Sequence, residues 1–194
     1  AANLPAGWSY VLPTESQWEY ACRAGTTTAY SWGNTIASSN ANYNASGINQ
    51  TRDVGQYAAN PWGFFDMPGN VWEWTADRYQ AAYPIGNPVV DPTGPTSGSA
   101  RVRRGGSWYA GGTALRSAGR RGDAPSYRPN TLGFRIGFQN TNNSPTNLNF
   151  TTPLTIAENQ PIGTVVGEFN ATDTDAGATL TYHLGSGAGD GNNS

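Results

Sequence analysis

Two carboxylates around the turn at residues 68–70 point most directly to metal chemistry. Asp66 precedes this Pro-Gly-Asn turn and Glu73 follows it. A hard cation such as Ca²⁺ prefers carboxylate and backbone carbonyl oxygens, and a tight turn can direct carbonyl groups at one point. The residues alone leave an alternative open, in which Asp66 forms an ordinary Asx turn and Glu73 is an exposed carboxylate.

The chain has one thiol and one imidazole. Cys22 is its only cysteine, and His183 is its only histidine. A single cysteine forms no internal disulfide, and it offers no pair of soft sulfur ligands of the kind that select Cu(I). Arg23 is the only nearby group that would stabilise a thiolate, and it is expected on another face of a helix. Cys22 is therefore interpreted as a small buried apolar group rather than a reactive thiol.

Arginines and aromatic residues are concentrated between residues 103 and 135. Guanidinium groups suit carboxylates and backbone carbonyls, and aromatic faces accept apolar or cationic groups, so the segment is a candidate ligand-recognition surface. In the alternative interpretation, Arg104, Arg116 and Arg135 bind core carbonyls and brace the loops of an irregular fold. The candidate ligand-binding residues are Trp108, Arg116 and Arg120, together with Tyr109, Arg121 and Tyr127, which are expected to be exposed.

Regular structure is predicted to be modest. The best helix is residues 13–25, with Thr14 as N-cap, Gln17 completing a capping box and Gly25 supplying the left-handed stop. Turn-forming residues dominate residues 26–61 and 91–99, which predicts long surface loops. Seven Trp and 10 Tyr are expected to fill the core between irregular segments.

Charge divides the chain into two parts. All 11 basic residues are arginines, and none lies beyond Arg135, so residues 140–194 carry only acidic groups. No basic run with interleaved aromatics occurs, and nucleic acid is not an expected partner. No apolar stretch approaches the ~20 residues that span a bilayer, so membrane insertion by this chain is not expected either.

Three motifs in this order carry a family resemblance. They are Leu-Pro-Thr-Glu-Ser-Gln-Trp-Glu-Tyr-Ala at 12–21, Gly-Phe-Phe-Asp-Met-Pro-Gly-Asn-Val-Trp-Glu-Trp at 63–74, and Arg-Gly-Gly-Ser-Trp at 104–108 with Arg116, Ala118, Arg120 and Gly-Phe-Arg at 133–135. Residues 1–139 thereby resemble the formylglycine-generating enzyme, or sulfatase-modifying factor, family. The resemblance implies a loop-rich α+β domain similar to a C-type lectin, with its amino-terminal edge incomplete because the family's early strands precede the first motif.

The same resemblance sets expectations about metals. Family oxidases hold copper with two cysteines shortly after the Gly-Gly-Ser element, and residues 108–115 contain no sulfur, so no copper is expected. Ergothioneine-pathway relatives bind iron through histidines, which the tail residue His183 does not match. The family's calcium sites imply these ligands here: the side chains of Asp66 and Glu73, the backbone oxygens of Gly69 and Val71, and, at a second site whose downstream loop is shorter, Asn42 and the Tyr43 carbonyl.

The carboxyl-terminal segment is predicted to be a separate module. Residues 140–147 form a linker, and residues 148–194 alternate apolar segments with turns in the manner of an all-β sandwich. This module resembles part of a cadherin repeat, about half of one. The resemblance implies Glu158, Asp173 and Asp175 as calcium ligands.

Two functional classes follow from these observations. The first is a non-catalytic, calcium-binding recognition or adhesion module fused to cadherin-like repeats on an extracellular or cell-surface protein, with a protein, peptide or glycan as ligand. The missing cysteine pair and the calcium-type carboxylates favour it. The second is a sulfatase-modifying-factor family enzyme that acts on protein cysteine, which the family resemblance favours.

Overall fold

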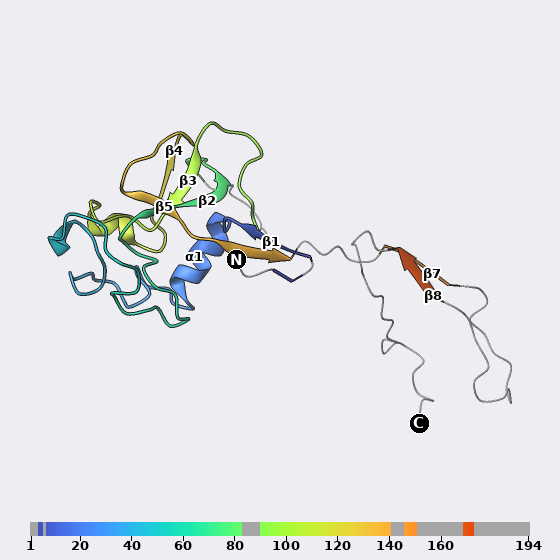
Figure 1. Cartoon of the computed structure of the whole chain (residues 1–194), viewed down its shortest axis with the longest axis horizontal. Helices are drawn as coiled ribbons and strands as arrows, with labels where there is room; N and C mark the ends of the chain where they lie inside the picture. Colours follow the sequence, from blue (N-terminus) through green and yellow to red (C-terminus); the bar gives the residue numbers. More distant parts are fainter. Residues whose placement is uncertain (1–3, 6, 83–89, 141–145, 151–168, 173–194) are drawn as a thin grey trace, which may run out of the picture. The chain divides into compact units, whose positions relative to one another are not determined.

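The computed structural model describes residues 4–5, 7–82, 90–140, 146–150 and 169–172 (Figure 1). The chain divides into two compact units, Tyr10–Gln139 and a second unit of Ala1–Ser9 with Asn140–Ser194. The first unit is a loop-rich α+β domain with small sheets, which confirms the predicted class. No helix in the described parts of the chain is long and apolar enough to cross a membrane.

The helix α1, Glu15–Arg23, begins at the predicted cap. The Gln17 N–H donates to Thr14 Oγ1 at 3.2 Å, and the Thr14 N–H donates to Gln17 Oε1 at 2.9 Å, so the capping box is confirmed. The predicted stop at Gly25 is one residue late. Ala24 already adopts the left-handed conformation at φ 47°, and Gly25 follows with φ 85°, because the chain reverses over two residues rather than one.

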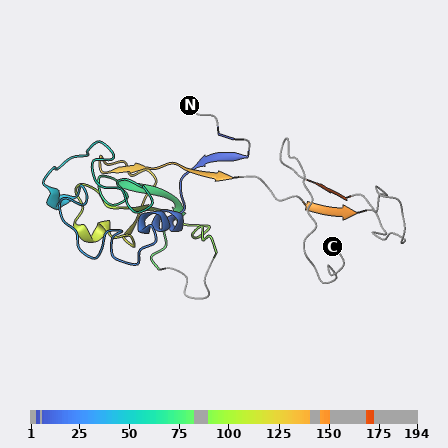
Figure 2. The same cartoon turned by 90° about the horizontal axis from the view of Figure 1, so that it is seen from below.

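The central sheet has four strands in the order β4-β3-β2-β5. Their bounds are Trp72–Arg78 for β2, Arg101–Arg104 for β3, Arg120–Asp123 for β4 and Leu132–Phe134 for β5. β3 is antiparallel to β2 and β4, and β5 is parallel to β2. α1 packs against β2 and β3 on one side of the sheet (Figures 1 and 2). Trp18 and Cys22 are buried there, as the predicted helix face requires.

Two small sheets complete the described structure. β1, Trp8–Val11, pairs with β6, Gly137–Asn140, and the rings of Tyr10 and Phe138 lie 5.4 Å apart. In the second unit β7, Thr146–Phe150, is antiparallel to β8, Phe169–Thr172. β7 begins inside the predicted linker. The rest of the predicted sandwich, at 151–168 and 173–194, lies outside the described residues.

The long loops build a core of their own. Tyr30, Ala41, Tyr43 and Leu115 are buried together. Two short 3-10 helices, Asn44–Ser46 and Gly112–Leu115, belong to the same part of the chain. The prediction of surface loops over residues 26–61 is therefore wrong for the buried members of this cluster, because apolar residues without a regular period give no pattern to recognise.

The backbone needs glycine at residues 105 and 106, directly after β3. Both have positive φ, 91° and 73°. A Cβ at Gly105 would lie 2.7 Å from the Met67 carbonyl oxygen, and one at Gly106 would lie 2.5 Å from Leu115 Cδ1. These two glycines let the third motif pass between the helix side of the sheet and the loop core.

Candidate functional site

The strand register places charged residues on both faces of the four-stranded sheet. Residues directly opposite one another on neighbouring strands project to the same face, and successive residues of one strand project to opposite faces. Two neighbouring rows of opposite residues therefore lie on different faces of the sheet. We call the face that packs on α1 the inner face and the other the outer face. The inner row is Glu73, Arg104 and Arg120, and the outer row is Trp74, Arg103 and Arg121.

The inner row is occupied by ion pairs with the helix. Arg104 has no exposed surface; its guanidinium contacts Glu19, lies 3.5 Å from Glu15 Oε1 and donates to the Gly119 carbonyl at 2.6 Å. Arg120 binds both carboxylate oxygens of Glu15, at 2.6 and 2.7 Å. These arginines hold the first and third motifs together. Arg120 was predicted to contact a ligand, but in the structure its guanidinium binds Glu15 on the inner face.

Two groups near this helix have pKa values raised by burial. The Cys22 thiol is fully buried, donates to Ser117 Oγ at 3.6 Å and has its pKa raised to about 11, mainly by desolvation. Burial also raises the pKa of Asp77, whose carboxylate accepts the Glu15 N–H at 2.6 Å. Cys22 is therefore a neutral, enclosed thiol at neutral pH, which confirms its interpretation as a buried apolar group.

Glu73, a predicted calcium ligand, forms an ion pair in the structure. Trp18 Nε1 and Arg135 Nε each donate to its Oε2 at 2.6 Å, and Arg135 Nη2 donates to its Oε1 at 2.7 Å. Glu73 is also buried. The carboxylate thus joins α1 to the segment after β5, and a cation bound there would share it with a guanidinium.

The other oxygens of the first predicted calcium site form fewer hydrogen bonds than the Glu73 carboxylate does. Asp66 has a φ of 53°, and its Oδ2 accepts the Gly55 N–H at 2.6 Å. Asp66 Oδ1 and the carbonyls of Gly69 and Val71 accept no hydrogen bond from the described part of the chain. Within that part, no three Asp, Glu, His or Cys residues form a metal-binding group. The available donor set is therefore one carboxylate with carbonyl oxygens, which suits Ca²⁺ by chemistry.

The second predicted site uses its oxygens within the protein. Asn42 is 1% exposed, its carbonyl accepts the Asn70 N–H at 2.8 Å, and its Oδ1 accepts Ser46 Oγ at 3.1 Å. The Tyr43 carbonyl accepts the N–H and the hydroxyl of Ser46, at 2.9 and 2.7 Å. In this structure Asn42 and Tyr43 tie the loop core to the turn at 68–70.

The outer face holds its arginines with aromatic rings. The Arg103 guanidinium lies 4.6 Å from the Trp72 ring centroid and 5.3 Å from that of Tyr127. Its Nε is 2.5 Å from Asp123 Oδ2, but the N–H does not point at the oxygen, so the contact is an ion pair without a directed hydrogen bond. Arg121 stands opposite Arg103 and is exposed. This face therefore presents positive charge next to aromatic surface.

The predicted ligand residues fall into separate groups. Arg121 and Tyr127 both flank Arg103 on the outer face, and Tyr127 is 43% exposed. Trp108 and Tyr109 form an edge-to-face pair elsewhere, and Tyr109 is 73% exposed. The structure therefore does not gather the six candidates into one surface. Those outside the outer face are Trp108, Tyr109, Arg116 and Arg120.

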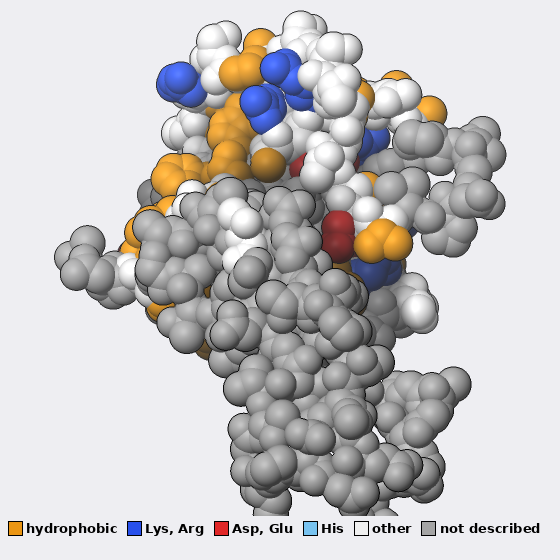
Figure 3. Space-filling model, turned by 90° about the vertical axis from the view of Figure 1, so that its right-hand side faces the viewer, with side chains coloured by type: hydrophobic (Ala, Val, Ile, Leu, Met, Phe, Trp, Pro, Cys, Tyr) orange, Lys and Arg blue, Asp and Glu red, His pale blue; other side chains and the backbone are white. Residues whose placement is uncertain are grey.

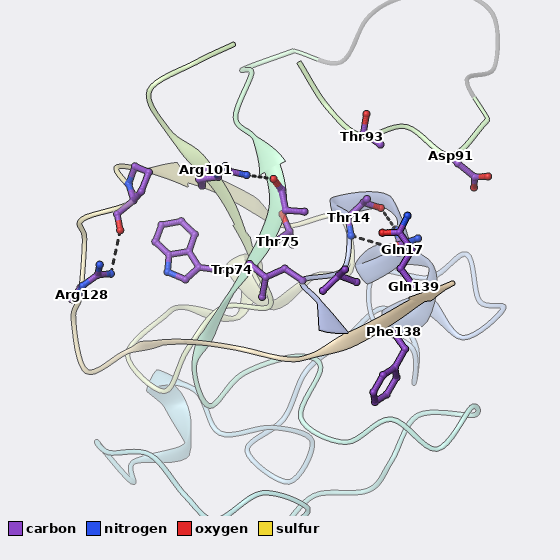
Figure 4. Close-up of a pocket in the computed structure, with 14 residues that line it drawn as sticks. Thr14, Gln17, Trp74, Thr75, Asp91, Thr93, Arg101, Arg128, Phe138 and Gln139 are labelled. Carbon is purple, nitrogen blue, oxygen red and sulfur yellow. Dashed lines mark hydrogen bonds between the residues drawn. The ribbon is translucent and has the colours of Figure 1, made fainter. Parts of the chain in front are cut away.

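A pocket on the outer face was not predicted from the sequence. It has a volume of about 890 Å³ and is half open to solvent. Trp74 on β2 and Arg101 on β3 line it with side chains from the start of the chain, β6 and the β4–β5 loop (Figure 4). We call it the Trp74 pocket; its main lining residues are Trp74, Arg101, Arg128, Phe138, Gln17 and Gln139.

A signal for this pocket was present in the sequence. The alternation Trp-x-Trp in 72–74 matches Arg-x-Arg in 101–103, and period-two patterns of this kind place both sets on one sheet face. Figure 3 shows hydrophobic side chains next to arginine side chains near the top of the view. The pocket's walls come from four separate segments, and no local pattern predicts that they meet.

Comparison with protein families matches residues 1–139 to the sulfatase-modifying factor enzyme 1-like domain. Formylglycine-generating enzyme of Streptomyces coelicolor is 36% identical over 141 residues, covering 64% of this chain and 45% of that protein. Serine/threonine-protein kinase pkn1 of Chlamydia caviae is 42% identical over 127 residues, covering 64% of this chain and 20% of the kinase. Inactive C-alpha-formylglycine-generating enzyme 2 of Bos taurus is 34% identical over 141 residues, covering 64% and 42%.

Two solved structures are also similar to this chain. Treponema denticola variable protein 1 matches with a TM-score of 0.63 and 34% identity, covering 68% of this chain and 48% of that one. PvdO from Pseudomonas aeruginosa matches with a TM-score of 0.59 and 30% identity, covering 66% and 51%. The chain thus spans less than half the length of the curated relatives named above.

Proposed function

Because the chain belongs to the sulfatase-modifying factor enzyme 1-like family over residues 1–139, we propose that it uses this scaffold for recognition rather than for cysteine oxidation. The observation that carries the proposal is the state of Cys22. The only thiol of the chain is fully buried, and its pKa is raised to about 11. It therefore offers neither a nucleophile nor an accessible soft ligand near neutral pH.

The outer face of the central sheet is the proposed recognition surface. Arg121 and Tyr127 are exposed there, and Arg103 between them is held by aromatic contacts. Two like charges directly opposite one another, Arg103 and Arg121, cost stability rather than add to it. A ligand with negative charge would offset that repulsion, so the face suits a protein, peptide or glycan that carries carboxylates.

The relatives are compatible with recognition. One carries the word "inactive" in its name and is 34% identical, and another is a variable protein with the same fold and 34% identity. The family therefore includes members that are not named as working oxidases. We propose an extracellular or cell-surface location for this protein.

An enzyme of the family remains the second candidate, favoured by the 36% identity to a formylglycine-generating enzyme. The test incubates the 194-residue chain with a Cys-x-Pro-x-Arg peptide, copper and oxygen, and follows formylglycine by mass spectrometry. The Streptomyces coelicolor enzyme serves as the positive control. We expect no product from this chain, and product above a boiled control would overturn the recognition proposal.

Calcium is the proposed cofactor, and the family is one that binds it. Asp66 Oδ1 and the carbonyls of Gly69 and Val71 would hold the ion, with Glu73 shared between the ion and Arg135. A bound ion would link the turn to the sheet, so EDTA should lower the melting temperature of the domain. Asp66→Ala should remove this sensitivity, whereas Asp53→Ala, a change at an exposed carboxylate, should keep it. An unchanged melting curve after chelation would remove Asp66 and Glu73 from the proposed site.

We propose the cadherin-like tail on sequence grounds alone. Glu158, Asp173 and Asp175 lie outside the described residues, and the family model matches residues 1–139. A calcium titration, monitored through the amide NMR signals of the tail, tests the proposed calcium site. Signals of Asp173 and Asp175 that do not move would exclude the repeat-type calcium site.

A further inference from the structure

We propose that the Trp74 pocket binds a sugar residue that carries a carboxylate, as part of an acidic oligosaccharide. This inference rests on the proposed recognition function. It adds the class of ligand and places the centre of binding in the pocket next to Tyr127 rather than at Tyr127 itself. The volume of about 890 Å³ lies within the range of small-molecule sites. Its half-open form leaves room for a chain that continues beyond the bound residue.

The floor of the pocket is an aromatic platform. Trp74 is partly exposed between the buried Glu73 and Thr75, so its indole lies on the outer face of β2. Phe138, 58% exposed, is a second aromatic residue of the lining. Pyranose rings have flat faces of C–H groups, which pack on aromatic rings whose faces carry partial negative charge. In Figure 4 the Trp74 ring lies between the positions of Arg101 and Arg128.

The charges in the pocket favour an anion. Two guanidinium groups, from Arg101 and Arg128, line it with one carboxylate, Asp91. Arg101 is anchored by a hydrogen bond to the Ala76 carbonyl, and Arg128 Nη1 donates to the Pro125 carbonyl at 3.2 Å. Each of these bonds uses one nitrogen of a three-nitrogen fork, so further N–H groups remain to bind a carboxylate.

Amide side chains on the remaining wall suit hydroxyl groups. Gln17 Oε1 accepts the Thr14 N–H at 2.9 Å, which fixes the amide and leaves its NH₂ group as a donor. Gln139 on β6 lines the same wall and is exposed. An amide offers both a donor and acceptors, and adjacent sugar hydroxyls present the complementary set. Aromatic floor, guanidinium forks and amides together match an acidic sugar.

An acidic peptide fits this pocket less well. Extended peptides gain affinity by adding a strand to an unpaired sheet edge. β2, which forms the floor, lies between β3 and β5 in the sheet and has no free edge. A peptide lying on β2 would therefore have to bind through side chains alone, whereas a sugar needs no backbone partner.

Titrations of the 194-residue chain test the proposal, with tryptophan fluorescence and calorimetry as readouts. The probes are trimers of galacturonate, mannuronate and guluronate, with neutral galactotriose and a hexaglutamate peptide as comparisons. We expect at least one uronate trimer to bind about tenfold or more tighter than galactotriose. Arg128→Gln should weaken that binding about fivefold or more, and Trp74→Ala should abolish it. Arg52→Gln, which changes an exposed arginine outside the pocket, should leave it unchanged.

The outcomes separate the two proposals. If no uronate trimer binds, or if galactotriose binds equally well, the acidic-sugar assignment is wrong. If hexaglutamate binds and the sugars do not, recognition stands and this ligand class falls. Should Trp74→Ala lose its folded circular dichroism spectrum, Trp74→Phe and Arg128→Gln decide, since both keep the packing of the pocket. Formation of formylglycine overturns the recognition function itself, by a readout that does not depend on sugar binding.

Discussion

The inner and outer faces of the central sheet carry the same residue type in opposite settings. On the inner face, Arg104 is completely buried among the carboxylates of Glu15 and Glu19. On the outer face, the adjacent Arg103 is 6% exposed, yet it lies between the rings of Trp72 and Tyr127. Arg103 and Arg104 are neighbours on β3, yet they differ in role. Arg104 joins the first and third motifs, whereas Arg103 supports an aromatic surface that is partly open to solvent.

This difference shows why a motif arginine is poor evidence for function by itself. The side-chain period of a strand is two, so register alone decides which of two neighbouring arginines meets the helix. Arg120 and Arg121 repeat the pattern on β4, where the first binds Glu15 and the second is exposed. If the comparison holds, the inner arginines contribute more to stability than the outer ones do.

The largest effect is expected from Arg104→Ala on the inner face. It removes the fully buried guanidinium from Glu15 and Glu19, which keep only the more exposed Arg120 and Arg23 as partners, and breaking such a buried pair costs about 3–5 kcal/mol. Urea denaturation followed by tryptophan fluorescence measures the loss, with the exposed Arg116→Ala as the control. A loss under about 1 kcal/mol would mean that the inner face does not depend on its ion pairs.

The second effect concerns Cys22, under the same face. Its pKa is raised to about 11 in the folded protein, from 9.0 for a solvated cysteine thiol, and desolvation is the main cause. The unfolded chain therefore releases its proton first, and stability is lost as the pH rises from 9.0 to about 11. The full loss is about 2–3 kcal/mol, at 1.36 kcal/mol per pKa unit.

Cys22→Ala supplies the control for this pH dependence. It removes the thiol and keeps the other groups that titrate at high pH, so the difference between the two proteins isolates Cys22. Thiol labelling gives a second measurement, because a buried thiol should react only as the domain opens. Rapid labelling of the native protein at neutral pH would contradict the enclosed site and weaken the recognition proposal.

A smaller effect is expected on the outer face from Arg103→Ala, about 1–2 kcal/mol. The guanidinium loses two aromatic contacts and an ion pair with Asp123, which is only partly buried. A double-mutant cycle with Tyr127→Leu should give a coupling of about 0.5–1 kcal/mol. The same cycle with Tyr109→Leu should give none, because the structure places Tyr109 with Trp108 instead. Equal coupling in both cycles would contradict the aromatic sandwich.

The features predicted best from the sequence are those that depend on residues close together in the chain. The capping box at Thr14 and Gln17 and the burial of Cys22 on α1 follow from residue types and spacing over a few residues. The Glu73–Arg135 pair did not follow, because those residues meet only through the parallel pairing of β2 with β5.

The candidate site shows the same limit. Tyr127 and Arg121 were singled out as exposed, and they are, at the outer face. Trp74 and Arg128 were not, although they line the pocket beside them. Composition marked residues 103–135 as rich in arginine, but the register that sorts these arginines by face depends on long-range strand pairing.

The smallest effect is expected from Arg121→Gln, and it is the most informative for function. Arg121 is exposed and stands directly opposite Arg103, so its removal relieves a like-charge contact. Stability should change by no more than about 0.5 kcal/mol, as for other surface changes. Arg120→Gln, one residue earlier, is the matched control; it breaks a bidentate pair with a buried carboxylate and should cost clearly more. If urea denaturation finds equal losses for the two variants, the faces do not differ in the way their partners indicate. If only Arg120→Gln destabilises, Arg121 is free to serve a ligand, and its charge can be varied in binding experiments without disturbing the fold.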